Sequence, residues 1–395
     1  MKRARNLSAA AAVVLSGVVL ASCGGSTGSK SATAGAGNST GFSAIVKQAH
    51  GQTVRWWLYG GDDKVNAYVD DVVAPAARKL GVQIRRVPVT DTADALQRVV
   101  AERRAGKTAG GAVDLIWING ENFASGKQAG LWLRGWARGL PNARRYVDQG
   151  DPAISHDFQV SVDGQESPWQ RAAFVYAYDS AKLKAPPQDL EALLAYAKAH
   201  PGRVTYPAPP DFTGSAFVRQ VVAARGEDAA FAYLKELKPY LYRHGTTYPK
   251  SEAELSTLFG DGKVDFAMSY DSSFVSSGVG KGEFPNSARP FLLGGGTLQN
   301  TSFVTIPADA AHQAGAQVVA NLLLSPRLQA AKLAPGSLGN PTVLDPRRLG
   351  PRERRLFGAA AASRYVLRDY GRTVSELPAS RVPPLERRWT QEILR

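Results

Sequence analysis

The alternation of strand-like and helix-like segments constrains the fold of this chain more than any other feature of its sequence. Residues 53–59 (TVRWWLY) have the β-branched and aromatic composition of a strand. Residues 62–80 then place apolar side chains at helical spacing, and Gly81 ends that pattern. Strand, helix and strand signals follow in the same order at 82–89, 91–105 and 113–118. This alternation predicts an α/β fold with a parallel sheet, helices on both faces and a ligand site at the carboxyl ends of the strands.

A second set of signals begins near residue 172. We expect strands at 172–178, 203–206, 264–269 and 302–306, and helices at 188–199, 217–224, 227–238, 251–259 and onward to the C-terminus. About 350 residues of globular composition exceed what one hydrophobic core usually spans, so two lobes are expected. Gly- and Pro-rich passages near Ser167 and Gly294 predict the hinge crossings. We therefore assign 43–167 to lobe 1, 168–290 to lobe 2, 291–335 to the return into lobe 1, and 336–395 to a C-terminal helical segment whose lobe stays open.

The N-terminus has the features of an exported lipoprotein. Lys2, Arg3 and Arg5 precede an apolar stretch that is too short for a mature membrane span, which predicts a signal peptide over 1–22. Cys23 is the only cysteine and follows Leu-Ala-Ser, a sequence that resembles the lipobox at which a diacylglycerol is attached. The alternative is an ordinary secretory signal with a chance cysteine. The Gly- and Ser-rich residues 23–42 predict a flexible linker. We expect the mature protein to be an extracytoplasmic monomer that is tethered to the cell membrane by Cys23.

The charge and the motif content exclude several classes of function. The formal net charge is +14, and its dispersed arginines accompany no nucleic-acid recognition motif, so attraction to an anionic envelope surface is the favoured interpretation. The local arginine clusters are Arg85-Arg86, Arg103-Arg104, Arg144-Arg145, Arg347-Arg348 and Arg352 to Arg355. Five histidines lack zinc-site spacing, and no nucleophile elbow or phosphate loop is complete. We expect neither an enzyme nor a bound metal or cofactor, although a glycosidase-like carboxylate pair stays open.

Four segments together resemble the YnjB-like solute-binding proteins, which are related to iron, polyamine and thiamine binders. They are WWLYGGDD at 56–63, DTADA at 91–95, DLIWINGENF at 114–123 and DGQESPW at 163–169. The resemblance extends over about residues 54–333. It implies a type II periplasmic-binding-protein fold, with two lobes, two main hinge crossings and a ligand enclosed between them. It also implies the permease subunits of an ABC importer as partners.

Candidate ligand residues in the first lobe follow from the strand-end rule. The first strand ends at Tyr59, Gly60, Gly61 and Asp62, and the third is followed by Asn119, Glu121 and Asn122. A plain turn is the alternative for the glycines, and a solvated or helix-capping carboxylate is the alternative for Glu121. Trp169 lies just before the first crossing, where its ring would either stack on a ligand or simply pack.

The second lobe offers an anion seat and aromatic walls. Thr213, Gly214 and Ser215 open a helix, where hydroxyls and backbone amides can bind an anion or merely cap the helix. Tyr270 and Asp271 follow a strand and supply an aromatic face and a carboxylate, and Tyr206 is a candidate second wall.

These groups together suit an organic cation with or without a phosphate group, and thiamine or a phosphorylated form of it fits best. A polyamine would leave the anion seat unused. Ferric iron would need tyrosine ligands, which Tyr59, Tyr206 and Tyr270 could supply.

Overall fold

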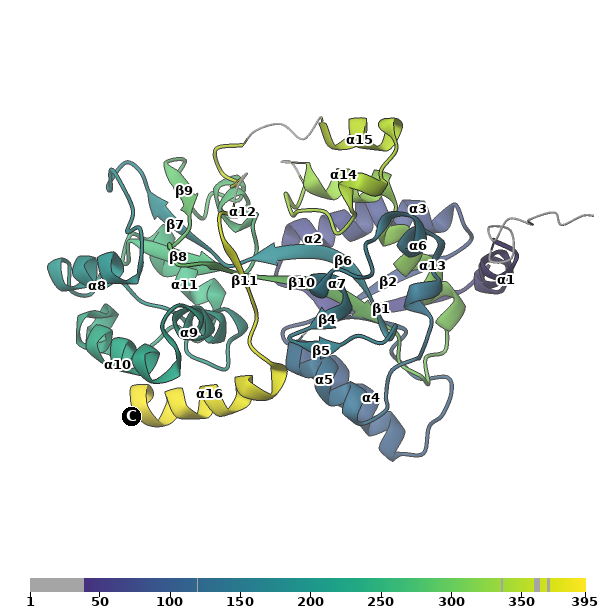
Figure 1. Cartoon of the computed structure of the whole chain (residues 1–395), viewed down its shortest axis with the longest axis horizontal. Coiled ribbons are helices and arrows are strands. Elements are labelled where there is room, and N and C mark those ends of the chain that lie inside the picture. Colours follow the sequence, from purple (N-terminus) through teal and green to yellow (C-terminus); the bar gives the residue numbers. More distant parts are fainter. Residues whose placement is uncertain (1–38, 119, 335–336, 359–362, 368–369) are drawn as a thin grey trace, which may run out of the picture. The chain divides into compact units, whose positions relative to one another are not determined.

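The computed structural model describes residues 39–118, 120–334, 337–358, 363–367 and 370–395. From residue 39 onward these form one compact unit with two main hydrophobic cores (Figure 1). We call the part built around the core with Val54 and Trp56 the larger lobe, and the part built around the core with Phe174 and Tyr206 the second lobe. The expected signal peptide, Cys23 and nearly all of the expected linker lie outside the described residues. Among the residues that are described, no helix combines the length and the apolar character needed to span a bilayer.

A six-stranded mixed sheet organises the larger lobe. Strands β1 (Thr53–Tyr59), β2 (Gln83–Val89) and β3 (Leu115–Ile118) pair in parallel, as the alternation predicts. Strand β10 (Thr297–Thr305) runs antiparallel to β3 on one edge and to β6 (Glu166–Ala173) on the other. Short β11 (Thr373–Ser375) extends the sheet beside β10. The expected parallel pairing is confirmed for β1, β2 and β3, and the whole sheet is mixed because β10 returns from the second lobe and enters the sheet in the opposite direction.

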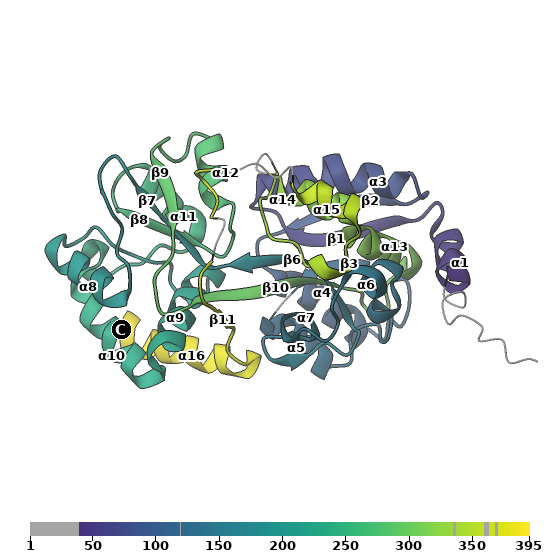
Figure 2. The ribbon, with the colours of Figure 1, turned by 45° about the horizontal axis from the view of Figure 1, so that its top comes forward.

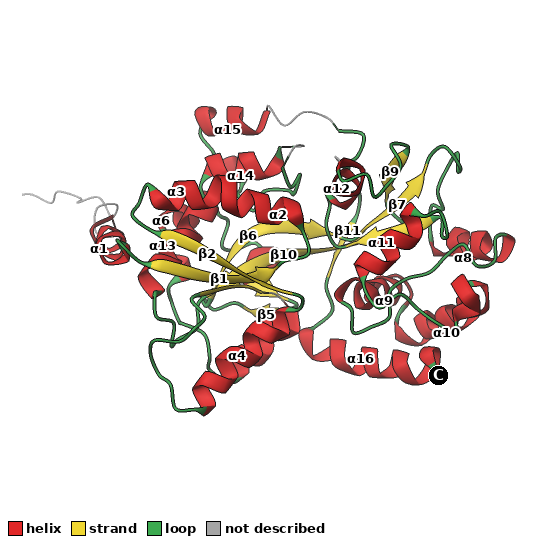
Figure 3. Cartoon of the chain, turned by 180° about the vertical axis from the view of Figure 1, so that it is seen from behind, coloured by secondary structure: helices red, strands yellow, loops and turns green. Residues whose placement is uncertain are grey.

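Helices cover both faces of this sheet (Figure 3). Those with the clearest sequence signals are α4 (Thr92–Arg104) and the segment predicted as one helix over 62–80. That segment forms α2 (Asp63–Ala67), a π-helical stretch (Tyr68–Val73) and α3 (Ala74–Arg78). The irregular stretch precedes Pro75, whose ring nitrogen cannot donate a helical hydrogen bond. The remaining helices are α1 (Ser39–Ala49), α5 (Gly120–Gln128), α6 (Pro141–Tyr146), α7 (Pro152–Ser155), α13 (Gln313–Leu323), α14 (Pro326–Leu333) and α15 (Pro351–Gly358).

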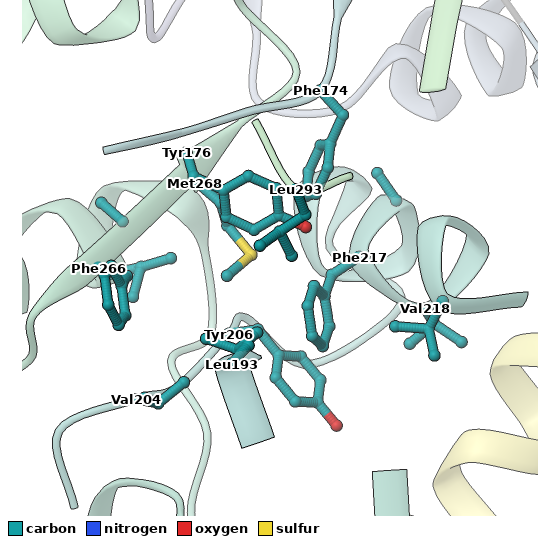
Figure 4. Close-up of a cluster of buried hydrophobic side chains, with 14 of the residues drawn as sticks. Phe174, Tyr176, Leu193, Val204, Tyr206, Phe217, Val218, Phe266, Met268 and Leu293 are labelled. Atoms are coloured by element: carbon teal, nitrogen blue, oxygen red, sulfur yellow. The ribbon is translucent and has the colours of Figure 1, made fainter. Parts of the chain in front are cut away.

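The second lobe is built on a small antiparallel sheet with the order β8, β7, β9 (Phe266–Ser269, Val175–Asp179 and Ala288–Phe291). Its helices are α8 (Leu190–Ala199), α9 (Phe212–Arg225), α10 (Glu227–Leu237), α11 (Glu252–Gly260), α12 (Phe274–Gly280) and α16 (Val382–Trp389). Figure 4 shows the aromatic core between them, with Tyr206, Phe217 and Phe266. The strand predicted over 203–206 is absent among these described residues, which make only a single bridge from Val204 to Leu241.

Two extended strands carry the chain between the lobes (Figure 2). The predicted strand 172–178 is in fact the end of β6 and the start of β7, separated by Phe174, whose amide donates to Leu298 in β10. Strand β10 itself places Leu298 in the second core and Val304 in the larger core. These strands form the first crossing and the return.

The C-terminal segment is divided between the lobes. Leu338, Val343 and Leu349 pack in the larger core, whereas Leu385 and Trp389 of α16 pack in the second core. Residues 370–376, which include β11, lie between these two parts. The expectation of helices throughout the tail is wrong at β11, because pairing with β10 holds this stretch extended.

Candidate functional site

The loop after β1 presents an exposed aromatic ring to acidic groups of the second lobe. Tyr59 is 39 % exposed, which is unusual for a large side chain here. Partial burial, and then the charges of Glu252, Asp211 and Asp62, raise the pKa of Tyr59 to about 12. Because Glu252 and Asp211 belong to α11 and the cap of α9, the Tyr59 phenol lies near both lobes.

Gly60 and Gly61 permit the close packing of this loop. A β-carbon at Gly61 would collide with the Tyr59 ring, and one at Gly60 would lie 2.5 Å from the Pro88 β-carbon. The contact with the Pro88 ring favours a glycine at position 60, whereas a side chain at position 61 would require the Tyr59 ring to move.

Asp62 caps α2 beside a junction between the lobes. Its Oδ1 accepts from the amides of Lys64 (2.8 Å) and Val65 (3.2 Å). The Lys64 Nζ donates to the Ser276 hydroxyl at 2.9 Å, and Lys281 is 3.0 Å from Asp63. These contacts join α2 to α12 and bring Asp62 close to Asp271.

Asp271 follows β8, as the strand-end rule predicts. Its Oδ1 and Oδ2 accept from the amide (3.0 Å) and the hydroxyl (2.8 Å) of Ser273. Burial, followed by the charge of Asp62, raises the pKa of Asp271 to about 7, against the opposing effects of Ser273 and Lys64. A further positively charged neighbour would therefore stabilise the ionised form of Asp271.

The start of α9 does not form the open anion seat that was one interpretation of its sequence. Asp211 caps the helix, with its Oδ1 accepting from the Gly214 amide at 2.9 Å. The Thr213 hydroxyl donates to Glu252, and the Ser215 hydroxyl accepts from Arg219 at 2.7 Å. Thr213 and Ser215 are buried, and their hydroxyl groups contact side chains of the protein and do not cap the helix. The helix N-terminus is already occupied by carboxylates of the chain itself.

Two residues that the sequence analysis missed lie beside this helix start. Glu252 begins α11, and burial, opposed by hydrogen bonds from Thr213 and Ser269 and reinforced by Asp211 and Asp271, raises its pKa to about 8. Phe212 is 37 % exposed, and its ring centroid lies 5.5 Å from that of Tyr270. Neither follows a strand, so the strand-end rule could not identify them. The sequence distinguishes Phe212 only by its position directly after Asp211, the residue that caps α9.

A buried ion pair lies under these groups. Arg219 of α9 contacts Glu376 at 2.8 Å, and both side chains are almost fully buried. The rings of Phe158 (5.4 Å) and Phe212 (5.3 Å) lie against the Arg219 guanidinium. Burial raises the pKa of Glu121, which also senses Arg219 and Glu376. The Arg219 charge is therefore already matched within the protein, and Glu376 is a further residue that the sequence analysis missed.

Other predicted residues lie away from this cluster. Trp169 is fully buried in the larger core, 5.1 Å from Trp117 and 5.8 Å from Trp56 between ring centroids. Tyr206 is fully buried in the second core and its hydroxyl accepts from the Trp389 indole at 3.0 Å. Both rings therefore pack, as the alternative for Trp169 allowed. Asn122 is half-buried in α5, and Asn119 lies outside the described residues.

The cluster as a whole is acidic and partly aromatic. Burial raises the pKa of Glu121, Asp211, Glu252 and Asp271, while the nearby cations Lys64, Lys281 and Arg219 contact Ser276, Asp63 and Glu376 respectively. We call it the acidic cluster, and its members are Asp62, Glu121, Asp211, Glu252 and Asp271, with Tyr59, Phe212 and Tyr270 as its rings. Across the described parts of the chain, no three His, Cys, Asp or Glu side chains converge on one metal-sized position.

Comparisons with known proteins agree with this architecture. Residues 71–345 match the family described as bacterial extracellular solute-binding protein. Protein YnjB of Escherichia coli is 39 % identical over 363 residues, covering 87 % of this chain and 92 % of YnjB.

Solved structures show the same fold at low sequence identity. The periplasmic binding protein AfuA of Actinobacillus pleuropneumoniae, solved with fructose-6-phosphate bound, is 14 % identical with a TM-score of 0.63, over 87 % of this chain and 98 % of AfuA. The ferric binding protein of Campylobacter jejuni is 14 % identical with a TM-score of 0.61, over 86 % and 98 % of the two chains. The expected type II periplasmic-binding-protein fold is confirmed. The chain belongs to the bacterial extracellular solute-binding proteins of ABC transporters, as a YnjB-like member.

Proposed function

We propose that this protein captures an organic cation for an ABC importer, and that a flat heteroaromatic cation such as thiamine is the first candidate. The observation that carries the proposal is the acidic cluster, in which Glu252 and Asp271 have pKa values raised to about 8 and about 7. For Asp271, burial and the charge of Asp62 outweigh the opposing charge of Lys64, and Glu252 has no ion-pair partner among the described residues, so both carboxyl groups would gain from a further positive charge. A cationic solute would supply it.

The exposed rings favour an aromatic solute over a simple polyamine. Tyr59 and Phe212 are both partly exposed, and each lies beside the capping aspartate Asp211. A cation over such a ring gains about 0.5 to 2 kcal/mol. A polyamine would use the carboxylates but leave the flat faces of the rings largely unused.

The two other solutes considered from the sequence have less support. A phosphate group would find the Thr213 and Ser215 hydroxyls engaged with Glu252 and Arg219. A ferric site built on three tyrosines would need Tyr206, which lies in the second core. Thiamine monophosphate and ferric iron are therefore comparison ligands in the test, alongside spermidine.

The proposed cellular setting follows from the sequence. Cys23 would carry a lipid anchor, and the flexible linker after it would hold a monomeric receptor on the outer face of the cell membrane, near the permease subunits. We propose a binding role without catalysis.

Titration calorimetry at pH 8 on thiamine, thiamine monophosphate, spermidine and ferric citrate tests the solute class. We expect thiamine to bind most tightly and its phosphate ester to bind more weakly. Tighter binding of the phosphate ester, or of ferric iron, would contradict the proposal.

Replacement of Cys23 by alanine should shift the protein from the membrane to the soluble fraction, and equal lipid labelling of both forms would refute the anchor.

A further inference from the structure

Three of the five arginine clusters in the sequence converge on one surface of the larger lobe. The main-chain amide of Asp345 donates to the Tyr146 carbonyl at 2.8 Å, which joins α6 to the segment before α15. Arg145 then lies 3.7 Å from Glu353, and Arg347 lies 2.9 Å from Asp148. We call this the basic surface, and its arginines are Arg138, Arg144, Arg145, Arg347, Arg348, Arg352 and Arg355.

The basic surface is exposed and carries excess positive charge. All seven arginines are exposed, and the nearby carboxylates are Asp148, Asp163, Asp345 and Glu353. A shallow hollow between α6 and the α15 segment is lined by three arginines and one carboxylate, with three further residues: Arg138, Arg144, Arg348, Asp148, Val147, Gln149 and Gly150. Its chemistry suits an anionic group such as a phosphate ester.

An exposed apolar side chain lies within this surface. Leu356 of α15 is 44 % exposed, whereas Phe357 next to it packs on the larger core. Arginines that flank an exposed leucine on a short helix are typical of contact with a bilayer interface, where the charges meet headgroups and the leucine enters the acyl boundary.

The chain leading to the proposed anchor is on the same lobe. The Gln52 side chain, just after α1, accepts from the Gly315 amide of α13 at 2.8 Å. The other end of α13 holds α6 through Asn321, whose side chain and carbonyl bond Asn142 at 2.9 and 2.7 Å. The residues between Cys23 and α1 would span at most about 55 Å when extended.

We propose that the basic surface docks onto anionic lipid headgroups and holds the larger lobe against the membrane. The proposal uses only the extracytoplasmic location from the proposed function and is independent of the solute. Each arginine near an anionic bilayer contributes to binding in a salt-dependent way. A lipid anchor on a flexible linker leaves the body of the receptor free to rotate. A second contact through the basic surface would fix its orientation relative to the membrane.

The test is cosedimentation with vesicles of phosphatidylcholine and phosphatidylglycerol, using an unlipidated chain that begins at Gly24. This chain retains the whole compact unit from residue 39 onward, including both cores. The basic-surface variant carries Arg144→Gln, Arg145→Gln, Arg348→Gln and Arg352→Gln. The matched control removes the same charge elsewhere on the larger lobe through Arg78→Gln, Arg85→Gln, Arg103→Gln and Arg104→Gln, all at exposed positions.

We expect the parent chain to bind anionic vesicles and not pure phosphatidylcholine, with binding lost at high salt. The basic-surface variant should lose roughly a hundredfold in partition coefficient, and the control should lose less than about threefold. Leu356→Ser should weaken binding severalfold. Unchanged melting temperatures would show that the variants are folded. Equal losses in the two quadruple variants, or a parent chain that ignores anionic vesicles, would overturn the proposal, and the latter result would point to an acidic protein partner.

Discussion

The two lobes contribute different chemistry to the candidate site. The larger lobe presents a rigid strand-end loop, in which Gly60 and Gly61 hold the exposed ring of Tyr59 and Asp62 is used as a helix cap. The second lobe presents carboxyl groups whose pKa values are raised, above all Glu252 and Asp271. The larger lobe therefore contributes mainly the shape of the candidate site, and the second lobe contributes most of the carboxyl groups with raised pKa values. The proposed cationic solute would place its positive charge toward the second lobe.

The largest expected effect concerns the buried ion pair that ties the C-terminal tail to the second lobe. Arg219→Met should leave Glu376 buried without its partner and lower the free energy of unfolding by about 3 to 5 kcal/mol. Chemical denaturation measures this loss. The control is Arg225→Met, whose partner Glu191 is largely exposed, and we expect it to cost less than about 1 kcal/mol. Similar losses in the two variants would show that the ion pair between Arg219 and Glu376 contributes little to the free energy of unfolding.

Removing carboxylates from the second lobe should weaken cation binding more than any change in the larger lobe. Asp271→Asn and Glu252→Gln should each cost about 1.5 to 3 kcal/mol in the affinity for the tightest cation of the panel, because a charged partner is lost. Titration calorimetry at pH 8.5, where both carboxyls are largely ionised, gives the values. Asp261→Asn, at the exposed far end of α11, should leave the affinity unchanged. A neutral analogue that loses as much affinity as the cation would argue against charge recognition.

The raised pKa values also predict how stability depends on pH without ligand. Glu252 has a pKa of about 8 in the folded protein against a normal value of 4.5, so the folded state holds this proton more tightly than the unfolded state does. Stability is therefore lost as the pH rises toward and through the folded pKa. We expect the unfolding free energy to be about 1 to 3 kcal/mol lower at pH 8.5 than at pH 6. Glu252→Gln should flatten this dependence, and a parent protein that is equally stable at both pH values would be inconsistent with an unmatched Glu252.

The smallest expected effects concern the aromatic rings. Tyr59→Leu in the larger lobe and Phe212→Leu in the second lobe should each weaken an aromatic cation by about 0.5 to 2 kcal/mol and spermidine by less. Leu394→Ala, which removes an exposed apolar side chain elsewhere, is the control. Calorimetry would separate the two ligands, and equal losses for thiamine and spermidine would mean that the rings only shape the site.

The sequence could predict those parts of the molecule that depend on local patterns. Residues 53–59 form β1 as expected because their β-branched and aromatic composition favours a strand. The strand-end rule selected Tyr59 and Asp62 at the end of β1 and Asp271 after β8, which belong to different sheets, and their contact with a solute stays a prediction. Glu252, Phe212 and Glu376 were missed because they come from helix starts and from the tail, whose neighbours depend on tertiary packing.

Aromatic residues show the same limit. The burial of Tyr206 depends partly on Trp389, which is far away in the sequence and contributes a hydrogen bond to its hydroxyl. Trp169 similarly packs between Trp56 and Trp117. Hydroxyl groups at a helix start look alike whether they bind a ligand or cap the helix, so Thr213 and Ser215 could be assigned only from their partners.

The most direct test of the central claim is the identity of the solute that the protein carries from the cell. The full chain, released from membranes under non-denaturing conditions at pH 8, would be denatured and the released small molecules identified by mass spectrometry. A parallel preparation of the variant with both Glu252→Gln and Asp271→Asn provides the comparison. We predict an organic cation, present in stoichiometric amount with the parent chain and strongly depleted in the variant. A sugar phosphate or another anion, retained equally by both proteins, would contradict the claim that the second lobe selects its solute by negative charge.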